Sequence, residues 1–158
     1  MFKDNKLNMV VSVLIILVVI GGLAYITINK NKNKMTAENN TQTVQKEGYK
    51  FTITKEGNGD IAKTGDTVAM NYTGMLADGT VFDSNVDPKF NHVQPFVFTI
   101  GAGQVIKGWD EGIAGMKTGE QRTLEINPEY GYGANGVGGV IPPNSVLTFK
   151  VELVAIKK

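Results

Sequence analysis

Few side chains in this chain could support catalysis, and the common catalytic groupings are incomplete. Asp110 and Glu111 are adjacent carboxylates, but neighbouring residues on a helix point in different directions, which favours a solvated face or helix-start charges over acid/base chemistry. His92 is the single histidine and lies in a polar stretch with nothing to orient it, so a Ser-His-Asp hydrolase has little support. Because the chain has no cysteine, thiolate catalysis is excluded and a zinc site nearly so.

A glycine-rich segment at residues 131–136, GYGANG, satisfies the letters of the dinucleotide-binding pattern G-x-G-x-x-G. That pattern works by leading from a strand into a helix whose N-terminus binds pyrophosphate. Here Gly138, Gly139 and the pair Pro142-Pro143 follow instead of a helix. We therefore expect a surface loop at this position and no nucleotide site.

Aromatic side chains are the remaining group of chemical interest, because they can line an apolar binding pocket. Those in expected strands, at strand ends or near glycines are Tyr72, Phe82, Phe96, Phe98, Trp109, Tyr130, Tyr132 and Phe149. Core packing is the simplest explanation for many of them. Trp109, however, lies between Gly108 and two acidic residues, and an indole in such a setting can form the floor of a pocket.

Short alternating runs punctuated by glycine begin at Tyr49 and indicate antiparallel strands. The pattern predicts strands over residues 49–56, 67–76, 81–84, 95–99, 121–126 and 145–156. Only residues 105–114 have a helical pattern, and the glycines at 101, 103, 108 and 112 limit that helix to one or two turns. The elements that must position any site are therefore a sheet and one short helix.

An apolar run, residues 9–28, precedes this region and contains only Ser12, Tyr25 and Thr27 as polar residues. As a helix it would be about 30 Å long, the thickness of the hydrocarbon core of a bilayer. The run predicts a transmembrane signal-anchor helix behind a short tail, residues 1–8. The alternative is a cleaved signal peptide, because Gly22-Leu23-Ala24 offers small residues at the positions that a signal peptidase reads.

Residues 29–47 are polar and poor in aromatic residues, which predicts a disordered linker before a domain of residues 48–158. A short N-terminal tail commonly stays inside while the following domain is exported. We therefore expect a single-pass protein of the cell membrane with an extracytoplasmic domain, or a secreted protein if the signal is cleaved. The domain carries ten basic and twelve acidic side chains, and Arg122 is the only arginine, so nucleic acid is not an expected partner.

Three ordered motifs of the domain resemble the FKBP family of peptidyl-prolyl cis/trans isomerases. They are VAMNYTGMLADGTVFDS at residues 68–84, FVFTIGAGQVIKGWDEG at residues 96–112 and PEYGYGANGVGGVIPPNSVLTFKV at residues 128–151. The resemblance covers about residues 48–157. It implies an α+β fold, an antiparallel curved β-sheet wrapped around one short α-helix, with the active site between them.

By position, the resemblance makes Trp109 the floor of the active-site pocket. Asp83 resembles the carboxylate of the pocket wall, and Tyr132 resembles the phenol that donates a hydrogen bond to a bound carbonyl, with the Ile106 N–H as a further donor. The expected catalytic residues are Asp83, Tyr132, Phe82 and Trp109, and the expected substrate-binding residues are Tyr72, Phe96, Val105, Ile106, Ile141 and Phe149. The 85–94 loop, NVDPKFNHVQ, is longer than in small members and lacks the arginine that usually pairs with the aspartate, for which Lys89 is the candidate substitute.

The resemblance implies an enzyme that interconverts cis and trans X-Pro bonds in exported or membrane-proximal polypeptides, without a cofactor or a metal. Its expected partners are proline-containing polypeptides and the membrane, and the family's macrolides are candidate ligands. The alternative is a membrane-tethered module that binds proline-containing peptides, or a folding helper, with little turnover. Asp83 and Tyr132 favour the enzyme.

Overall fold

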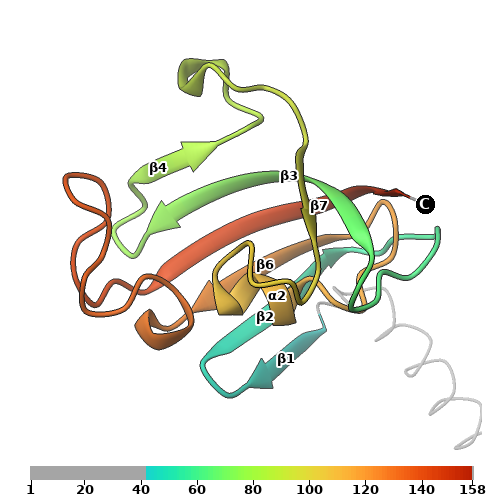
Figure 1. The fold of residues 1–158 in the computed structure, drawn as a ribbon, viewed down its shortest axis with the longest axis horizontal. Coiled ribbons are helices and arrows are strands. Elements are labelled where there is room, and N and C mark those ends of the chain that lie inside the picture. The colour runs from blue at the N-terminus through green and yellow to red at the C-terminus, as the bar shows by residue number, and fades with distance from the viewer. Residues whose placement is uncertain (1–41, 158) are drawn as a thin grey trace, which may run out of the picture. The chain divides into compact units, whose positions relative to one another are not determined.

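The structure is a computed structural model that describes residues 42–157, and these residues form a seven-stranded sheet with a short helix on one face (Figure 1). In chain order the elements are β1 (Thr43–Lys46), β2 (Tyr49–Lys55), β3 (Thr67–Leu76), β4 (Val81–Ser84), η1 (Pro88–Phe90), β5 (Phe96–Thr99), α2 (Lys107–Gly112), β6 (Gln121–Ile126), η2 (Pro128–Tyr130) and β7 (Leu147–Lys157). The strand order is β1-β2-β6-β7-β3-β4, with β5 paired to β3. Every pairing is antiparallel, which confirms the expected fold class.

The strands form where apolar and polar residues alternate along the chain, because successive side chains of a strand point to opposite faces. Along β7, Leu147, Phe149, Val151 and Leu153 are buried, and the residues between them are partly or fully exposed. The buried residues of this face form the core together with residues of α2 and the loop after it. The core comprises Tyr49, Ala62, Val68, Met70, Phe98, Ile100, Trp109, Ile113, Met116, Leu124, Ile126, Ile141, Leu147, Phe149, Val151 and Leu153.

Two glycines allow α2 to pack closely against β6. A Cβ atom on Gly108 would lie 2.6 Å from the side chain of Ile126, and one on Gly112 would lie 2.8 Å from Leu124. Larger residues at these positions would push the helix away from the sheet. The helix has six residues, fewer than the expected range 105–114, and the glycines that shorten it also set its distance from β6.

β1 corrects the predicted boundary of the linker. Residues 43–46 were expected to belong to a disordered segment, yet they pair with β2 from Thr43 opposite Thr52 to Lys46 opposite Tyr49. The turn between the strands contains Gly48, whose φ of 74° favours glycine. β1 is polar, lies at the edge of the sheet and is largely exposed, so it lacks the apolar alternation that identifies the other strands.

A long loop joins β4 to β5, and Asn85 fixes both of its ends. The Asn85 Nδ2 donates hydrogen bonds to the carbonyl oxygens of Met70 and Gln94, each at 2.9 Å. Its Oδ1 accepts from the Tyr72 N–H at 2.7 Å. Asn85 is buried, so the loop leaves and rejoins the sheet at points set by one amide side chain.

Within residues 42–157, the structure contains no helix long and apolar enough to cross a bilayer. The predicted transmembrane helix at residues 9–28, the tail before it and most of the predicted linker lie outside the described residues.

Candidate active site

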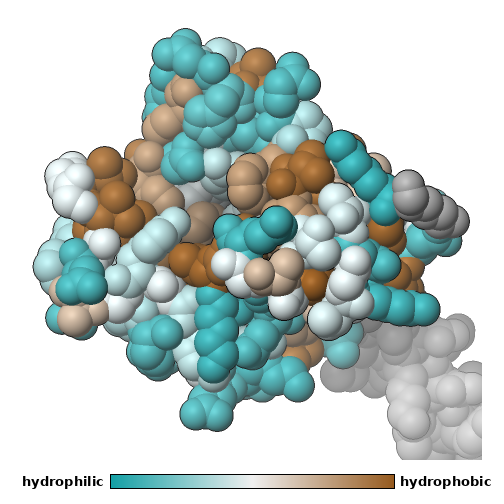
Figure 2. Space-filling model, in the orientation of Figure 1, coloured by the Kyte–Doolittle hydropathy of each residue, from teal (hydrophilic) through white to brown (hydrophobic). Residues whose placement is uncertain are grey.

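The candidate active site is a pocket of about 220 Å³ between α2 and the sheet. Figure 2 shows this side of the molecule, where hydrophobic side chains gather around a hollow. The pocket is lined by Tyr72, Phe82, Asp83, Phe96, Gln104, Val105, Ile106, Trp109, Tyr132 and Phe149. The structure thus brings together every predicted site residue except Ile141, from segments as far apart in sequence as β3 and β7.

Trp109 forms the floor of the pocket. It lies in the middle of α2, is 5% exposed, and its ring is edge-on to Tyr72 at 5.4 Å and to Phe149 at 5.3 Å between centroids. Phe98 and Phe96 surround it at 5.8 and 6.2 Å. Edge-to-face contacts at these distances are favourable and fix the orientation of the rings, so the floor is rigid.

Gly74 in β3 makes room for one aromatic wall of the pocket. A Cβ atom at this position would lie 2.6 Å from the Phe82 ring and 2.8 Å from the Phe149 ring. Those two rings meet over the glycine in a T-shaped contact at 5.6 Å. A glycine is required here because Phe82 of β4 and Phe149 of β7 meet directly above this position of β3.

Several hydrogen-bond donors at the pocket have no partner within residues 42–157, and one of them is the buried indole N–H of Trp109. Two others are placed to bind a ligand: the hydroxyl of Tyr132, a residue that is 40% exposed, and the backbone N–H of Ile106, the residue that precedes α2. Burial, and to a smaller extent the charge of Asp83, raises the pKa of Tyr132 above its ordinary value. The phenol therefore stays protonated at neutral pH and can donate to a carbonyl oxygen in the pocket.

The carboxylate of Asp83 accepts hydrogen bonds from three groups. Its Oδ2 accepts from the Tyr72 hydroxyl at 2.6 Å, and its Oδ1 accepts from the Ser84 N–H at 2.9 Å and lies 2.9 Å from Nε2 of His92. Burial raises the pKa of Tyr72 well above its ordinary value, and the hydrogen bond to Asp83 raises it further. Asp83 is therefore held in one orientation on the pocket wall.

Two expectations for the long loop are corrected by this geometry. Lys89 does not pair with Asp83, because its Nζ lies 3.3 Å from the carboxylate of Asp87. His92, for which the sequence offered no orienting partner, instead contacts Asp83. The loop turns back through η1 and through Asn91, which has a φ of 59°, and this reversal, invisible in the spacing of the residues, brings His92 to β4.

Ile141 is the predicted site residue that the structure places elsewhere. It is 4% exposed and belongs to the core, and its backbone pairs with Val137 across the 131–144 loop. Gln104 takes a place on the pocket lining, and its Oε1 accepts a hydrogen bond from the Thr99 N–H at 2.8 Å. Ile141 thus supports the loop that carries Tyr132 rather than the pocket surface.

Asp110 anchors the loop that leads into α2. Its two carboxylate oxygens accept hydrogen bonds from the N–H groups of Gly101 at 3.0 Å and Gly103 at 2.9 Å. Glu111 points elsewhere, to Lys107 at 3.8 Å on the exposed side of the helix. The expectation of a solvated face thus fits Glu111. Asp110 instead holds the backbone of the preceding loop, a role that cannot be predicted without knowing the local backbone geometry.

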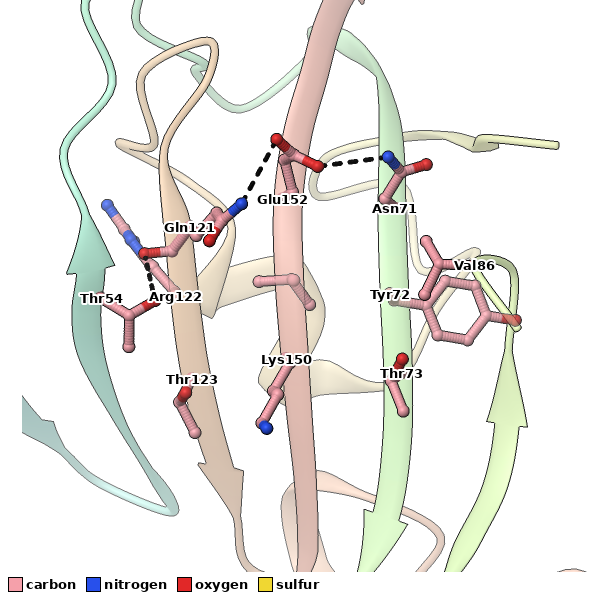
Figure 3. Close-up of a pocket in the computed structure, with 11 residues that line it drawn as sticks. Thr54, Asn71, Tyr72, Thr73, Val86, Gln121, Arg122, Thr123, Lys150 and Glu152 are labelled. Carbon is pink, nitrogen blue, oxygen red and sulfur yellow. Dashed lines mark hydrogen bonds between the residues drawn. The ribbon is translucent and has the colours of Figure 1, made fainter. Parts of the chain in front are cut away.

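A second hollow, of about 410 Å³, lies on the other face of the sheet (Figure 3). The outward-pointing residues of β3, β6 and β7 line it, and Glu152 accepts hydrogen bonds there from Asn71 at 3.2 Å and Gln121 at 3.5 Å. Its lining carries threonines and Lys150, with Tyr72 as its single aromatic residue. This hollow is larger than the Trp109 pocket, but it is more open, and Glu152 at its edge is already paired with Asn71 and Gln121.

Comparison with known proteins places the chain among similar proteins of one family. Residues 59–154 match the family model described as FKBP-type peptidyl-prolyl cis-trans isomerase. The chain is 54% identical over 110 residues to FK506-binding protein 1 of Dictyostelium discoideum, covering 70% of this chain and 99% of that protein. It is 52% identical over 110 residues to a peptidyl-prolyl cis-trans isomerase of Schizosaccharomyces pombe, covering 69% and 95%. An FK506-binding protein of Neisseria meningitidis serogroup B is 52% identical over 102 residues, covering 65% and 90%.

Proposed function

The chain belongs to the FKBP-type peptidyl-prolyl cis-trans isomerase family and is an enzyme of that class, and from this premise we propose that the Trp109 pocket is where it twists the X-Pro amide. The proposal rests on how the rings and the hydrogen-bond donors of the pocket are arranged. Aromatic rings surround a buried indole, and the Tyr132 hydroxyl and the Ile106 N–H are donors at the pocket that have no partner in the described part of the chain.

The reaction is rotation about the C–N bond, which breaks no covalent bond and needs neither a nucleophile nor a metal. Its barrier of about 20 kcal/mol arises because the perpendicular amide loses its resonance. The carbonyl of that twisted form is less polar than the carbonyl of the planar ground state. A dry aromatic pocket that binds the twisted form better than either planar isomer therefore lowers the barrier by differential binding.

Each part of the site has a task in this scheme. The prolyl ring lies over Trp109 between the walls of Phe82 and Phe149, and the donors Tyr132 and Ile106 hold carbonyl oxygens of the bound peptide in the twisted geometry. Asp83 orders the wall through its hydrogen bond with Tyr72. The same apolar walls and unpaired donors are suited to macrolides of the FK506 type, which we propose as inhibitory ligands.

The direct test is an isomerisation assay on an X-Pro peptide. The fragment used should begin at Gln42, so that β1 is retained. We expect acceleration of cis/trans exchange that an FK506-type macrolide inhibits. Binding of the macrolide without acceleration would instead indicate the tethered peptide-binding module, and absence of both would contradict the assignment of the pocket.

Replacing Tyr132 by phenylalanine should reduce kcat/KM only modestly. One neutral hydrogen bond contributes roughly 0.5–1.5 kcal/mol, which corresponds to a loss of about 2–15-fold. Asp83→Ala should cost somewhat more, because it also releases Tyr72 and His92. The measurement is kcat/KM of both variants from pH 5 to 9, and because the pKa of Tyr132 is raised, its donor stays present throughout this range.

Tyr130→Phe is the matched control for Tyr132→Phe. Tyr130 packs on Tyr49 at 6.0 Å and under the Lys107 ammonium at 3.9 Å, outside the pocket lining, so its loss should leave kcat/KM unchanged. A loss of about 100-fold or more with a bell-shaped pH profile, for Tyr132→Phe or Asp83→Ala, would indicate general acid/base catalysis. That result would contradict the twisted-amide mechanism.

We further propose that the enzyme acts on exported or membrane-proximal polypeptides from a single-pass anchor at residues 9–28. The support is the length and apolarity of that segment. The full-length chain should fractionate with membranes, and a variant that lacks residues 1–41 should not. The domain should also be digested when protease is added outside intact cells.

Other outcomes of this fractionation distinguish the alternatives. Recovery of a soluble protein with a new N-terminus near Tyr25 would show a cleaved signal peptide. Protection of the domain from external protease, with the chain still in the membrane, would place the domain on the cytoplasmic side.

A further inference from the structure

His92 lies in the long β4–β5 loop, and its side chain reaches the carboxylate of Asp83 on the pocket lining. Its Nε2 lies 2.9 Å from the Asp83 Oδ1. The loop's other charged side chains, Asp87 and Lys89, pair with each other at 3.3 Å, and Asp87 also caps η1 by accepting from the Lys89 N–H. The contact with Asp83 is therefore specific to His92 and is not a general attraction of the loop.

A chain of contacts leads from this contact to the pocket floor. The other oxygen of Asp83 accepts from the Tyr72 hydroxyl at 2.6 Å. The Tyr72 ring in turn stands edge-on to Trp109 at 5.4 Å and to Phe96 at 6.2 Å. A change in the strength of the His92–Asp83 contact would therefore alter the position of the Tyr72 ring, which is part of an aromatic wall of the site.

We propose that His92 is a positioning residue of the isomerase, which orients Asp83 and Tyr72 more firmly when its imidazole is protonated. This inference rests on the proposed function of the Trp109 pocket. Histidine changes charge between pH 5 and 8, and protonation adds the attraction between unlike charges to a hydrogen bond that a carboxylate already accepts. Catalytic efficiency should then rise as the pH falls through this range.

The titratable groups around His92 and Asp83 would not by themselves make kcat/KM change between pH 5 and 8. On the pocket side the titratable groups are the phenols of Tyr72 and Tyr132, and burial raises the pKa of both, so they remain neutral from pH 5 to 8. In the loop, Asp87 and Lys89 are already paired. The side chains of His92 and Asp83 are 49% and 38% exposed, so solvent and salt screen the pair and limit the effect to a few-fold.

The test is the pH profile of kcat/KM for the full-length protein, purified in detergent with a tag that contains no histidine. A protease-free assay on an X-Pro peptide avoids the pH dependence of a coupling enzyme. We expect kcat/KM to be about 2–4-fold higher at pH 5.5 than at pH 8 in low salt, and this difference to shrink in high salt. In His92→Gln the profile should be flat.

Lys89→Gln is the matched control, because it removes a cation of the same loop that does not contact Asp83. It should keep the step in the profile. Since His92 is the only histidine of the chain, its Cε1–H gives one NMR signal that needs no assignment. The midpoint of its pH-dependent shift should coincide with the midpoint of the step in kcat/KM, a coincidence that a histidine without a role in catalysis would not produce.

Two results would overturn the inference. One is a wild-type enzyme that is active but has a flat profile from pH 5.5 to 8, and the other is a step that survives in His92→Gln. Either result would leave the proposed function intact, because each is measured on an active isomerase. Absence of activity at every pH would instead contradict the assignment of the pocket.

Discussion

Arg122→Met should lower the free energy of unfolding by about 3–5 kcal/mol, because it leaves a carboxylate buried without its counter-ion. Arg122 and Glu120 are 5% and 2% exposed, and the Arg122 Nε donates to Glu120 Oε1 at 2.5 Å. The guanidinium also donates to the Gly112 carbonyl at 2.8 Å and lies over the Phe51 ring at 4.1 Å. The substitution therefore releases the C-terminal end of α2 from the sheet as well.

Urea unfolding of the fragment that begins at Gln42 measures this loss. Lys50→Met is the matched control, because the Lys50–Glu125 pair is close to half exposed on both sides and exposed pairs contribute about 0–1 kcal/mol. Replacing both Glu120 and Arg122 by apolar residues should restore part of the stability, since no charge is then left unpaired. A single Arg122→Met variant within about 1 kcal/mol of the wild type would contradict the prediction.

Trp109→Ala should lower both the stability and the activity of the enzyme. Removing a buried tryptophan typically costs about 3–5 kcal/mol. The indole also provides the surface on which the prolyl ring is bound, and burial of such a ring contributes about 1.5–3 kcal/mol. Activity per folded molecule should therefore fall by roughly 10–150-fold.

Two further variants separate packing from catalysis. Met116→Ala removes another fully buried side chain away from the pocket, and it should reduce stability with little change in kcat/KM per folded molecule. Trp109→Phe should remain folded and keep part of the activity. In the wild type, Trp109 is the only tryptophan, so its fluorescence should change when a macrolide binds, and activity per molecule unaffected in Trp109→Phe and Trp109→Ala would remove the indole from the mechanism.

The parts of the fold that the sequence predicts are those with strong alternation or distinctive motifs. β6 and β7 carry buried residues at every second position over most of their length, and β3 lies within one of the distinctive motifs. The predicted ranges of these three central strands are confirmed to within two residues. β1 was missed because a short polar edge strand has no buried face to create a pattern. Its formation depends on pairing with β2, which the local sequence does not contain.

The features of the site likewise divide into those that the motifs predict and those that depend on contacts between distant segments. Trp109, Tyr132, Asp83 and the aromatic walls come together as the motifs predict. The partner of Asp83 was wrong because η1 and the left-handed Asn91 reverse the loop, so that a residue nine positions away is in contact. The roles of Asp110 and of the Glu120–Arg122 pair also depend on backbone groups from other segments, which side-chain types alone do not reveal.

The place of β7 between β6 and β3 has a consequence for how the protein is made. Thr67 pairs with Lys157 and Leu76 with Leu147, so the central pairing of the sheet joins segments made early and late in translation. At roughly 5–20 residues per second, β3 waits for several seconds before its partner leaves the ribosome. The domain therefore cannot complete its fold during most of its own synthesis, and its folding, once the chain is complete, should take milliseconds to seconds, as in other sheets built from distant pairings.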